Sequence, residues 1–470
     1  MRIIRSTDPV TVANYSISKK LYGKTGWRWI KDYLPDGRTV NLLRRILKVN
    51  RKRLNGGTKY MFGIPIPRNT RQAYEFNKNN GNTAWTDAIA EEMEKISSFG
   101  TFEATPIRAR LPQGYQHVPL HMCFAVKWDR RHKARLVAGG NWTEPDRTDV
   151  YSGVVTTEAV RIGLLVAAAN DLEVRVGDVG NAYLHSQTRE KIDTYTGPEF
   201  GPLQGRCLII LKALYGLRTS GARWHETFAN DLMRLGFTPM RADPNMWIRL
   251  HRSGYEYITV YVDNVLVFSK RADVVMEKLQ EIYKMKGVGR PELYLGGNMA
   301  YFPGSAVMYT SAEKYLTVLL KRLEENLGIR LKNYSSLMEA EYHPELEASP
   351  VLGEHDHSIY RMLVGSAQWA VTLGRADIAF AVSTMARFSA MPREGHLSAM
   401  FRLYGYLKGS LKAKIIYDTR VPDYSALLGC QEPDWMEMYP GACEEIDSEK
   451  DPQPRGAEVV VSAYVNADHA

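Results

Sequence analysis

Hydrophobic and polar residues alternate along the chain with periods that distinguish helices from strands. A period near 3.6 predicts helices over 85–96, 156–168 and 222–235, the last ending at Gly236, while Thr156 or Thr157 caps the second. Runs rich in β-branched and aromatic residues predict strands around 122–128 and 133–138. An alternating strand is expected over 172–178, where Leu172, Val174, Val176 and Asp178 would share one face.

The second half of the chain has one clear hairpin pattern and then mostly helical periods. Two β-branched runs over 255–269 flank Asp263–Asn264, which we expect at the turn. Thr310 and Glu313 have the spacing of a capping box for a helix over 311–327 that ends at Gly328. Three further helices are expected over 359–373, 378–390 and 397–408. Mixed elements followed by helices predict an α+β body with a helical appendage.

Composition excludes several classes of protein. The 470 residues suggest two to four domains, and 44% hydrophobic with 24% charged residues excludes wholesale disorder. The longest apolar run, 162–169, is far short of the ~20 residues that span a membrane, and the N-terminus has no secretory signal. Four scattered cysteines indicate neither a disulfide scaffold nor a zinc module. We therefore expect a soluble intracellular protein with no membrane partner.

Charge is unevenly distributed. Residues 1–60 hold fifteen lysines and arginines against three aspartates, a balance of +12, whereas residues 431–470 hold two against ten acids, a balance of −8. A basic leading segment with interleaved aromatic residues is suited to binding phosphates. The alternative is a solvated basic helix over 44–54 that only keeps the chain soluble.

Two carboxylates are candidates for chemistry. Asp178 continues an apolar strand face, which is costly unless a cation or hydrogen-bond donors compensate it. Asp263 is expected at the tip of a rigid hairpin. Two such acids on neighbouring strands could hold Mg²⁺, which prefers a few carboxylates together with substrate phosphates. Ordinary turn and strand-end chemistry explains both residues equally well when each is taken alone.

Several short motifs follow one another after about residue 84. They are HKARLVAGG (132–140), DVGNAYL (178–184), ALYGLRTSGARWH (213–225), GFTPMRADPNMWI (236–248), YVDN (261–264), LYLGGNM (293–299) and AYVNADHA (463–470). In this order they resemble the conserved blocks of the reverse transcriptase region of copia-type LTR retrotransposon polyproteins. The resemblance extends from about Ala84 to the last residue.

The resemblance implies a right-hand polymerase with fingers, palm and thumb, a helical connection segment and a truncated RNase H-like start. The implied boundaries are a basic leader or linker at 1–83, fingers and palm at 84–300, thumb at 301–345, connection at 346–455 and the RNase H start at 456–470. On this interpretation the chain is a fragment of a polyprotein. It would act inside the cell, in cytoplasmic virus-like particles or in the nucleus.

The resemblance also implies a site. Asp178 and Asp263 would be the catalytic metal ligands, with the Val179 carbonyl, for Mg²⁺ or alternatively Mn²⁺. The implied substrate-binding residues are Lys133, Arg135, Asn181, Ala182, Tyr183, Gly216 and Arg218. The implied partners are an RNA or DNA template with its primer, and dNTPs, while the oligomeric state is not predicted.

These residues would have distinct roles. Lys133 and Arg135 would grip the triphosphate, and Tyr183 would stack under the incoming sugar and exclude a 2′-hydroxyl. Gly216 would allow close approach to the templating base pair, and Arg218 would contact template phosphate. The alternative interpretation of Lys133 and Arg135 is a solvated basic strand. The alternative interpretation of Gly216 is an ordinary loop glycine.

The sequence departs from the family at two acids. Asn264 stands where the family has the second Asp of YVDD, at the third catalytic position, and Asn466 replaces the first catalytic Asp of the RNase H strand. Each change removes negative charge that would bind Mg²⁺. We therefore expect severely impaired polymerase activity and no RNase H activity. The alternatives are an inactive relic that retains only nucleic-acid binding, or a structural subunit that partners an active polymerase.

Overall fold

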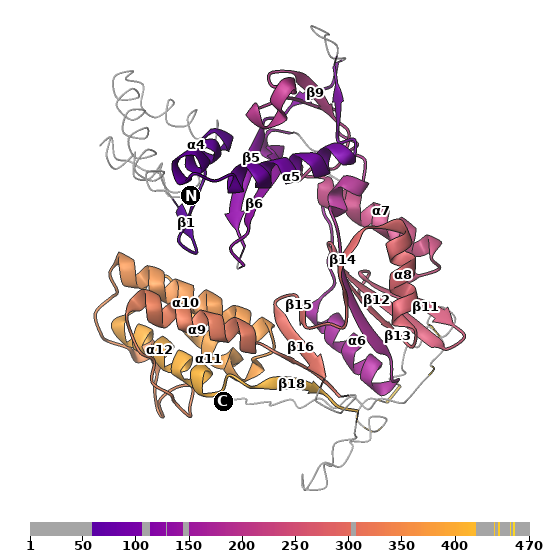
Figure 1. The fold of residues 1–470 in the computed structure, drawn as a ribbon. Helices are drawn as coiled ribbons and strands as arrows, with labels where there is room; N and C mark the ends of the chain where they lie inside the picture. Colours follow the sequence, from indigo (N-terminus) through magenta and orange to yellow (C-terminus); the bar gives the residue numbers. More distant parts are fainter. Residues whose placement is uncertain are drawn as a thin grey trace. The chain divides into compact units, whose positions relative to one another are not determined.

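The chain passes three times between two structural units. Unit 1 comprises residues 1–144 and 188–218, and unit 2 comprises residues 145–187 and 219–470. The computed structural model describes residues 59–105, 113–127, 129–143, 150–301 and 307–419, together with 437, 440, 441, 452 and 455 (Figure 1). The basic helix expected over 44–54 and the strand carrying Asn466 lie outside these residues.

Unit 1 is built around a hairpin with a helix along it. Strands β5 and β6 pair antiparallel from Leu120↔Ala138 to Val126↔His132, and α5 packs on β6 (Figure 1). Trp85 of α5 is 1% exposed and meets the ring of Phe124 edge-on. The described elements of this unit are β1 (Lys59–Met61), β2 (Ile64–Ile66), α4 (Thr70–Asn80), α5 (Ala84–Ser98), β3 (Phe102–Ala104), β4 (Gln116–His117), β5 (Leu120–Val126), β6 (His132–Ala138), η1 (Gly140–Trp142), β8 (Ile192–Tyr195), η3 (Pro198–Leu203) and β9 (Cys207–Ile210).

The main sheet of unit 2 has the strand order β10-β11-β12-β13-β7-β14, and every neighbouring pair is antiparallel. Its strands are β7 (Glu173–Val179), β10 (Thr238–Pro239), β11 (Met246–His251), β12 (Gly254–Tyr261), β13 (Asn264–Ser269) and β14 (Met285–Gly289). The accompanying helices are α6 (Thr157–Ala169), η2 (Ala182–His185), α7 (Ser220–Arg234) and α8 (Ala272–Ile282).

Strand β13 is buried on both faces, which places it at the centre of this sheet. Val265 and Val267 belong to a core shared with α7 and α8, whereas Leu266 and Phe268 belong to a second core shared with α6. Successive side chains of a strand point to opposite faces. Helices α7 and α8 therefore cover one face of the sheet, and α6 covers the other. A strand covered on both sides favours a continuous apolar run, and residues 265–268 supply it.

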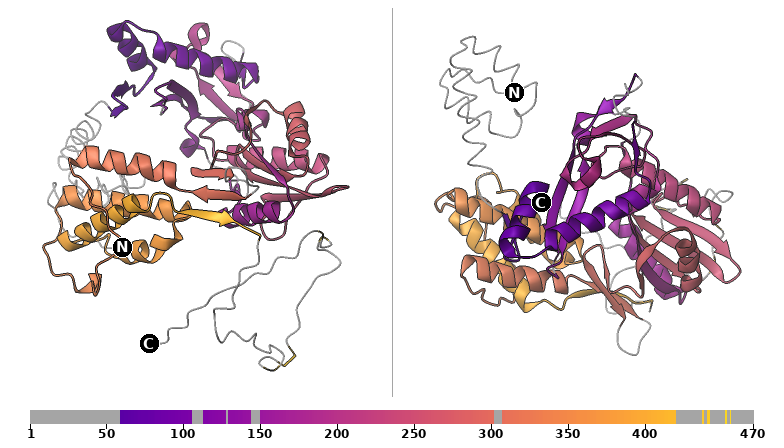
Figure 2. Two further views of the ribbon diagram at one scale, coloured as in Figure 1. Left: turned by 60° about the horizontal axis from the view of Figure 1, so that its bottom comes forward. Right: turned by 45° about the horizontal axis from the view of Figure 1, so that its top comes forward.

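A second sheet and a helical block complete the described part of unit 2. The sheet has the order β15-β16-β17-β18. Helix α10 contacts α11 and α12, and α12 contacts α9, within the orange helical block of Figure 2. The bounds are β15 (Leu293–Tyr294), β16 (Gly297–Tyr301), β17 (Met308–Ser311), α9 (Glu313–Leu327), η4 (Pro344–Leu346), α10 (Glu354–Thr372), η5 (Ala376–Ile378), α11 (Ala379–Ala386), α12 (Glu394–Gly409) and β18 (Lys414–Tyr417).

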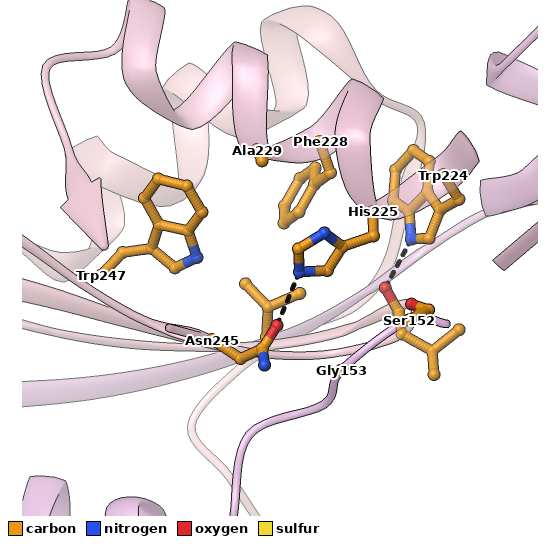
Figure 3. A pocket seen from close by; sticks show the side chains of 10 residues that line it. Ser152, Gly153, Trp224, His225, Phe228, Ala229, Asn245 and Trp247 are labelled. Carbon is orange, nitrogen blue, oxygen red and sulfur yellow. Dashed lines mark hydrogen bonds between the residues drawn. The ribbon is translucent and has the colours of Figure 1, made fainter. Parts of the chain in front are cut away.

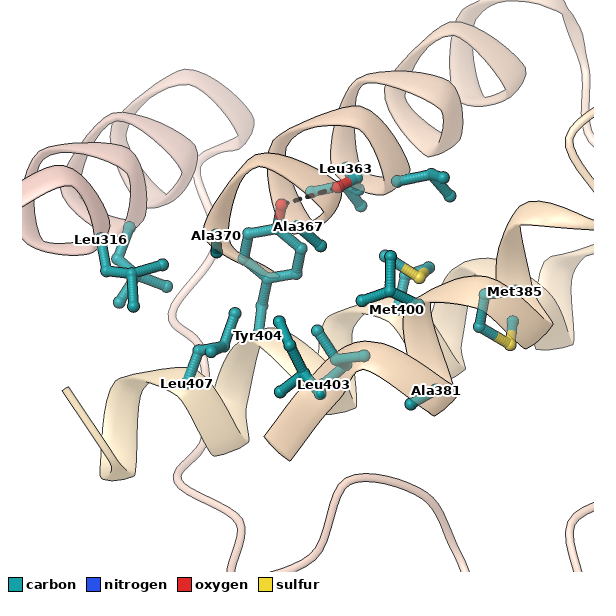
Figure 4. Packing of buried hydrophobic residues seen from close by; sticks show 14 of the residues in the cluster. Leu316, Leu363, Ala367, Ala370, Ala381, Met385, Met400, Leu403, Tyr404 and Leu407 are labelled. Carbon is teal, nitrogen blue, oxygen red and sulfur yellow. Dashed lines mark hydrogen bonds between the residues drawn. The ribbon is translucent and has the colours of Figure 1, made fainter. Parts of the chain in front are cut away.

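One hydrophobic core joins the helices α9, α10, α11 and α12 of this block (Figure 4). It includes Leu316 of α9, Leu363 of α10, Met385 of α11 and Leu403 of α12. The buried Tyr404 hydroxyl donates a hydrogen bond to the Leu363 carbonyl at 2.8 Å, which satisfies the polar group inside the core. Residues on both sides of position 345, the expected end of the thumb, therefore share this core, and the domain boundaries stay predictions.

Most predicted elements are confirmed, with ends displaced by a few residues. The Thr156 side chain caps α6 by accepting from the Ala159 N–H, and Gly328 ends α9 in the left-handed conformation. The expected capping box is wrong, because Thr310 and Ser311 belong to β17 and Ala312 precedes the helix without a side-chain cap. The pairing of β17 with β18, more than a hundred residues later, overrides the local capping pattern.

The hairpin turn is displaced by one residue from the prediction. Tyr261 pairs with Asn264, so the two turn residues are Val262 and Asp263, and Asn264 is the first residue of β13. The pairing of β13 with β7 extends to Asn264 and thereby sets this register. None of the described helices has an apolar stretch long enough to cross a membrane.

A buried cluster of charged side chains stabilises the open end of the β12–β13 hairpin, away from its turn. The Glu256 side chain is 1% exposed and accepts hydrogen bonds from Arg249, Arg271 and Ser269 at 2.6–2.9 Å. Burial by itself would raise the pKa of Glu256, but these hydrogen bonds outweigh it and hold the pKa below the ordinary 4.5. The charged carboxylate is therefore the form that the fold stabilises.

Replacing the carboxylate should destabilise the protein. Glu256→Gln should lower the free energy of unfolding by about 2–4 kcal/mol, because two partly buried arginines lose their counter-charge. Because the folded pKa lies below the unfolded one, the contribution of Glu256 is complete above about pH 4.5 and is lost as the pH falls through the folded pKa. Urea unfolding between about pH 7 and about pH 3 measures both effects.

Glu281→Gln is the matched control, because Glu281 forms only an exposed pair with Lys278. Equal effects of the two substitutions would contradict the assigned role of the buried cluster.

Candidate active site

The pairing of β7 with β13 brings the two predicted acids to the same end of the sheet. Asp178 lies directly opposite Asn264 in the antiparallel register, and Asp263 immediately precedes Asn264. The Val179 N–H donates to the Asp263 carbonyl at 2.7 Å, so the hairpin turn is bonded to the end of β7. Asp178, Asp263 and Asn264 are all partly exposed. The predicted catalytic residues are thus brought together.

The donor atoms at this place are hard oxygens, which suits Mg²⁺. Two carboxylates, Asp178 and Asp263, supply two negative charges, and the Asn264 amide donates from Nδ2 to Asp263 Oδ1 at 3.3 Å. Within the described ranges no three His, Cys, Asp or Glu side chains gather into a metal site. Because Mg²⁺ commonly takes one or two carboxylates and retains waters or phosphate oxygens, this set fits one such ion. The Asn264 amide adds no negative charge to this pair.

Lys286 is a residue of this site that sequence reasoning missed. It lies opposite Asp178 on the other side of β7, in the register of β14, and is exposed. Nothing in the local sequence marks it, because β14 joins β7 only through sheet topology. A lysine beside this aspartate adds a positive charge next to the carboxylate pair.

The residues that follow Asp178 have structural roles of their own. Asn181 adopts a left-handed conformation with φ of 55°, which asparagine tolerates better than most residues. The Ala182 side chain is 1% exposed and lies in the core with Trp224, so it is not available to a ligand. Tyr183 is partly exposed and packs against the same core. Of these three residues, Tyr183 retains an accessible ring.

Lys133 and Arg135 lie on one face of β6 in unit 1, whereas the two acids belong to unit 2. The Arg135 guanidinium stacks on the Tyr215 ring at 3.8 Å. Burial and then the nearby charge of Arg135 lower the pKa of Lys133. Burial also raises the pKa of the adjacent Glu92, whose carboxylate accepts from the Leu136 N–H at 3.2 Å. The two cations are therefore a partly buried basic pair.

Gly216 packs against the backbone of β6, and Arg218 is bonded to the start of η1. Gly216 has φ of 94°, and a Cβ atom there would lie 2.1 Å from the Ala138 carbonyl oxygen. Arg218 donates from Nε to the Gly140 carbonyl at 2.9 Å. Within the described structure, the close approach at Gly216 is to the backbone of β6 and not to a base pair. A substrate contact for either residue stays a prediction.

Asp243, in the segment ADPN (242–245) of the fourth motif, has a structural role. The buried Asp243 carboxylate accepts from the Thr156 N–H, the Thr156 hydroxyl and the Asn245 N–H at 2.8–2.9 Å. It therefore fixes the start of α6 beside the start of β11. This is a positioning role, and the sequence alone gave no sign of its partner.

Comparisons with known proteins agree with the motif pattern. The family described as "Reverse transcriptase (RNA-dependent DNA polymerase)" matches residues 107–327. Two similar proteins are retrovirus-related Pol polyproteins, from transposon TNT 1-94 of Nicotiana tabacum and from transposon RE1 of Arabidopsis thaliana. Each is 27% identical over 341 residues, which is 69% of this chain but 25% and 22% of those proteins.

The chain thus spans about a quarter of the length of these curated relatives. A solved foamy viral protease–reverse transcriptase in complex with double-stranded DNA covers 68% of this chain and 48% of its own, with a TM-score of 0.34 and 10% identity. The resemblance to the reverse transcriptase region of copia-type Pol polyproteins is confirmed by the family and by the curated relatives.

Adding a methyl group to Gly216 should disrupt unit 1. Gly216→Ala should lower the free energy of unfolding by about 3–5 kcal/mol, because it combines a positive φ with a backbone clash. Gly114→Ala is the matched control, since Gly114 has φ of 99° but meets only the flexible end of Lys191 at 3.9 Å. It should cost about 1–2 kcal/mol. Urea unfolding measures both, and equal costs would refute the packing explanation.

Proposed function

We propose that this chain, whose residues 107–327 match the reverse transcriptase family, is an RNA-directed DNA polymerase domain of a retrotransposon Pol polyprotein. The observation that carries the proposal is the β7–β13 register, which sets Asp178 beside the turn that carries Asp263. In the proposed right-hand arrangement, unit 1 supplies the fingers and the six-stranded sheet is the palm. Helix α9 begins the thumb, and α10–α12 form the connection segment.

The proposed ligands are an RNA or DNA template with its primer, dNTPs and Mg²⁺, with Mn²⁺ as the alternative ion. Asp178 and Asp263 would hold the ion with the Val179 carbonyl. When bound, such an ion supplies positive charge that stabilises phosphoryl oxygens during displacement at phosphorus. Lys133 and Arg135 would bind the triphosphate through charge-assisted hydrogen bonds, and the accessible Tyr183 ring would support the sugar.

Asn264 would limit this activity without disturbing the fold. As the first residue of β13 it pairs through its backbone with Asp178 and Tyr261, and these pairings do not require a carboxylate. Its amide lacks the negative charge that a second ion would require. We therefore propose a polymerase that is folded but weakly active.

Restoring the carboxylate should raise activity. Asn264→Asp should increase primer extension on poly(rA)/oligo(dT) with Mg²⁺ by at least about tenfold, which corresponds to about 1.4 kcal/mol of barrier. The control is Asn298→Asp in β16, where the side-chain oxygen only accepts from the Lys314 N–H and an aspartate oxygen can replace it. The control should leave extension unchanged.

Other outcomes would redirect the interpretation. Equal extension by the unsubstituted protein and Asn264→Asp would mean that the amide is tolerated. No extension by either protein, with primer–template binding retained in a filter-binding assay, would favour the inactive relic. If Asn298→Asp activated as strongly as Asn264→Asp, the assignment of the site would be wrong.

A further inference from the structure

The turn that carries Asp263 has an unfavourable backbone. Val262 has φ of 58°, and it is the only β-branched residue with positive φ in the described ranges. Residues with β-branched side chains rarely adopt a positive φ. A residue held in this conformation raises the free energy of the folded state by about 1–3 kcal/mol. Such residues persist where the surrounding structure holds them, so the contacts of this turn are informative.

Hydrogen bonds from two different elements hold the peptide groups on both sides of Asp263. The Trp224 indole Nε1–H of α7 donates to the Val262 carbonyl at 2.6 Å. The Val179 N–H of β7 donates to the Asp263 carbonyl at 2.7 Å. Fixing both flanking carbonyls fixes the backbone from which the Asp263 side chain projects.

The Trp224 ring is itself firmly placed. It is 2% exposed, and it stacks on Phe228 with ring centroids 5.1 Å apart and an interplanar angle of 23° (Figure 3). Tyr283 meets it edge-on at 5.5 Å, and the Tyr283 hydroxyl is bonded to Asp231 of α7. The neighbouring rings thus hold the indole in place. Its single donor, the Nε1–H group, therefore loses little conformational entropy when the hydrogen bond forms.

We infer that Trp224 is a positioning residue that holds the Val262–Asp263 turn in its strained conformation and thereby orients the Asp263 carboxylate. The inference deepens the proposed function, since its importance rests on Asp263 being a metal ligand. Trp224 acts through the turn and need not touch substrate. A residue that only fills the core could be replaced by another aromatic ring, whereas a positioning residue requires the indole N–H.

The molecule offers a matched control for this distinction. Trp247 is 4% exposed, belongs to the same hydrophobic core and lines the same small pocket as Trp224 (Figure 3). It lies on β11, where it pairs with Ile258 of β12, whereas the hydrogen bond to the Val262 carbonyl comes from Trp224. Tryptophan-to-phenylalanine changes at the two positions remove the same atoms from the same core.

The first experiment compares Trp224→Phe with Trp247→Phe by hydrogen–deuterium exchange of peptides that span 255–269. Trp224→Phe should accelerate exchange at the amides of Asp263 and Asn264 about tenfold, the equivalent of about 1.4 kcal/mol for one lost hydrogen bond. Trp247→Phe should leave these amides unchanged. If the two variants accelerate exchange equally, or if neither does, the inference is overturned.

A second variant guards against a general loss of folding. Trp224→benzothienylalanine keeps the shape of the ring and replaces only the N–H by sulfur, so the core stays filled. It should reproduce the faster exchange at the turn with unchanged exchange in α7. Unchanged exchange at the turn would mean that the ring acts by packing alone, which would overturn the inference.

Metal binding separates this inference from the proposed function. Titration with Mn²⁺, followed by electron paramagnetic resonance, should show affinity weakened about tenfold by Trp224→Phe and unaffected by Trp247→Phe. If the unsubstituted protein binds no Mn²⁺, the proposed metal site fails, while the exchange data still decide the role of Trp224. Weakened binding in both variants would contradict a specific role for Trp224.

Discussion

The antiparallel pairing of β7 with β13 is the interaction on which the rest of the site depends. It joins segments 86 residues apart, from Asp178 to Asn264, and it does so in the middle of a sheet that is covered on both faces. A slip of one residue would turn Val265 to the face that Leu266 now occupies and Leu266 to the face of Val265, so each side chain would enter the wrong core. The hydrophobic cores therefore enforce the register that sets the polar residues side by side.

The same constraint explains how an amide is accommodated at position 264. The strand requires backbone hydrogen bonds and a side chain that tolerates partial exposure there, and asparagine meets both requirements. The side-chain charge at position 264 can thus change without disturbing the fold. By contrast, Glu256 and Asp243 accept several hydrogen bonds as buried carboxylates, so at those positions the charge and the architecture cannot be separated.

Helices, helix ends and buried strands that depend on neighbouring residues were predicted correctly from the sequence. Helical periods, the cap at Thr156, the stop at Gly328 and the continuous apolar run of β13 are all readable from neighbouring residues. The motif order also anticipated that Asp178 and Asp263 lie at the same end of the sheet. The errors arose where distant partners decide, as at Thr310, which pairs in β17 instead of capping a helix.

The partners of the turn could not have been predicted in the same way. Trp224 lies within a recognised motif, yet nothing in its local sequence points to the Val262 carbonyl 38 residues later. Lys286 and Asp243 were missed for the same reason. Tertiary hydrogen bonds and sheet neighbours depend on topology, and periodicity carries no information about them.

The passage of the chain between the two units has a consequence for its synthesis on the ribosome. Strand β7 emerges early, but its partner β13 follows only after the chain has gone back to unit 1 and returned. Unit 1 likewise lacks β8 and β9 until the first segment of unit 2 has been made. Neither unit can therefore be completed as a contiguous N-terminal piece, and apolar strand edges wait unpaired while translation continues. Until residue 269 has been made, β7 has no partner in β13, and an unpaired apolar strand favours aggregation.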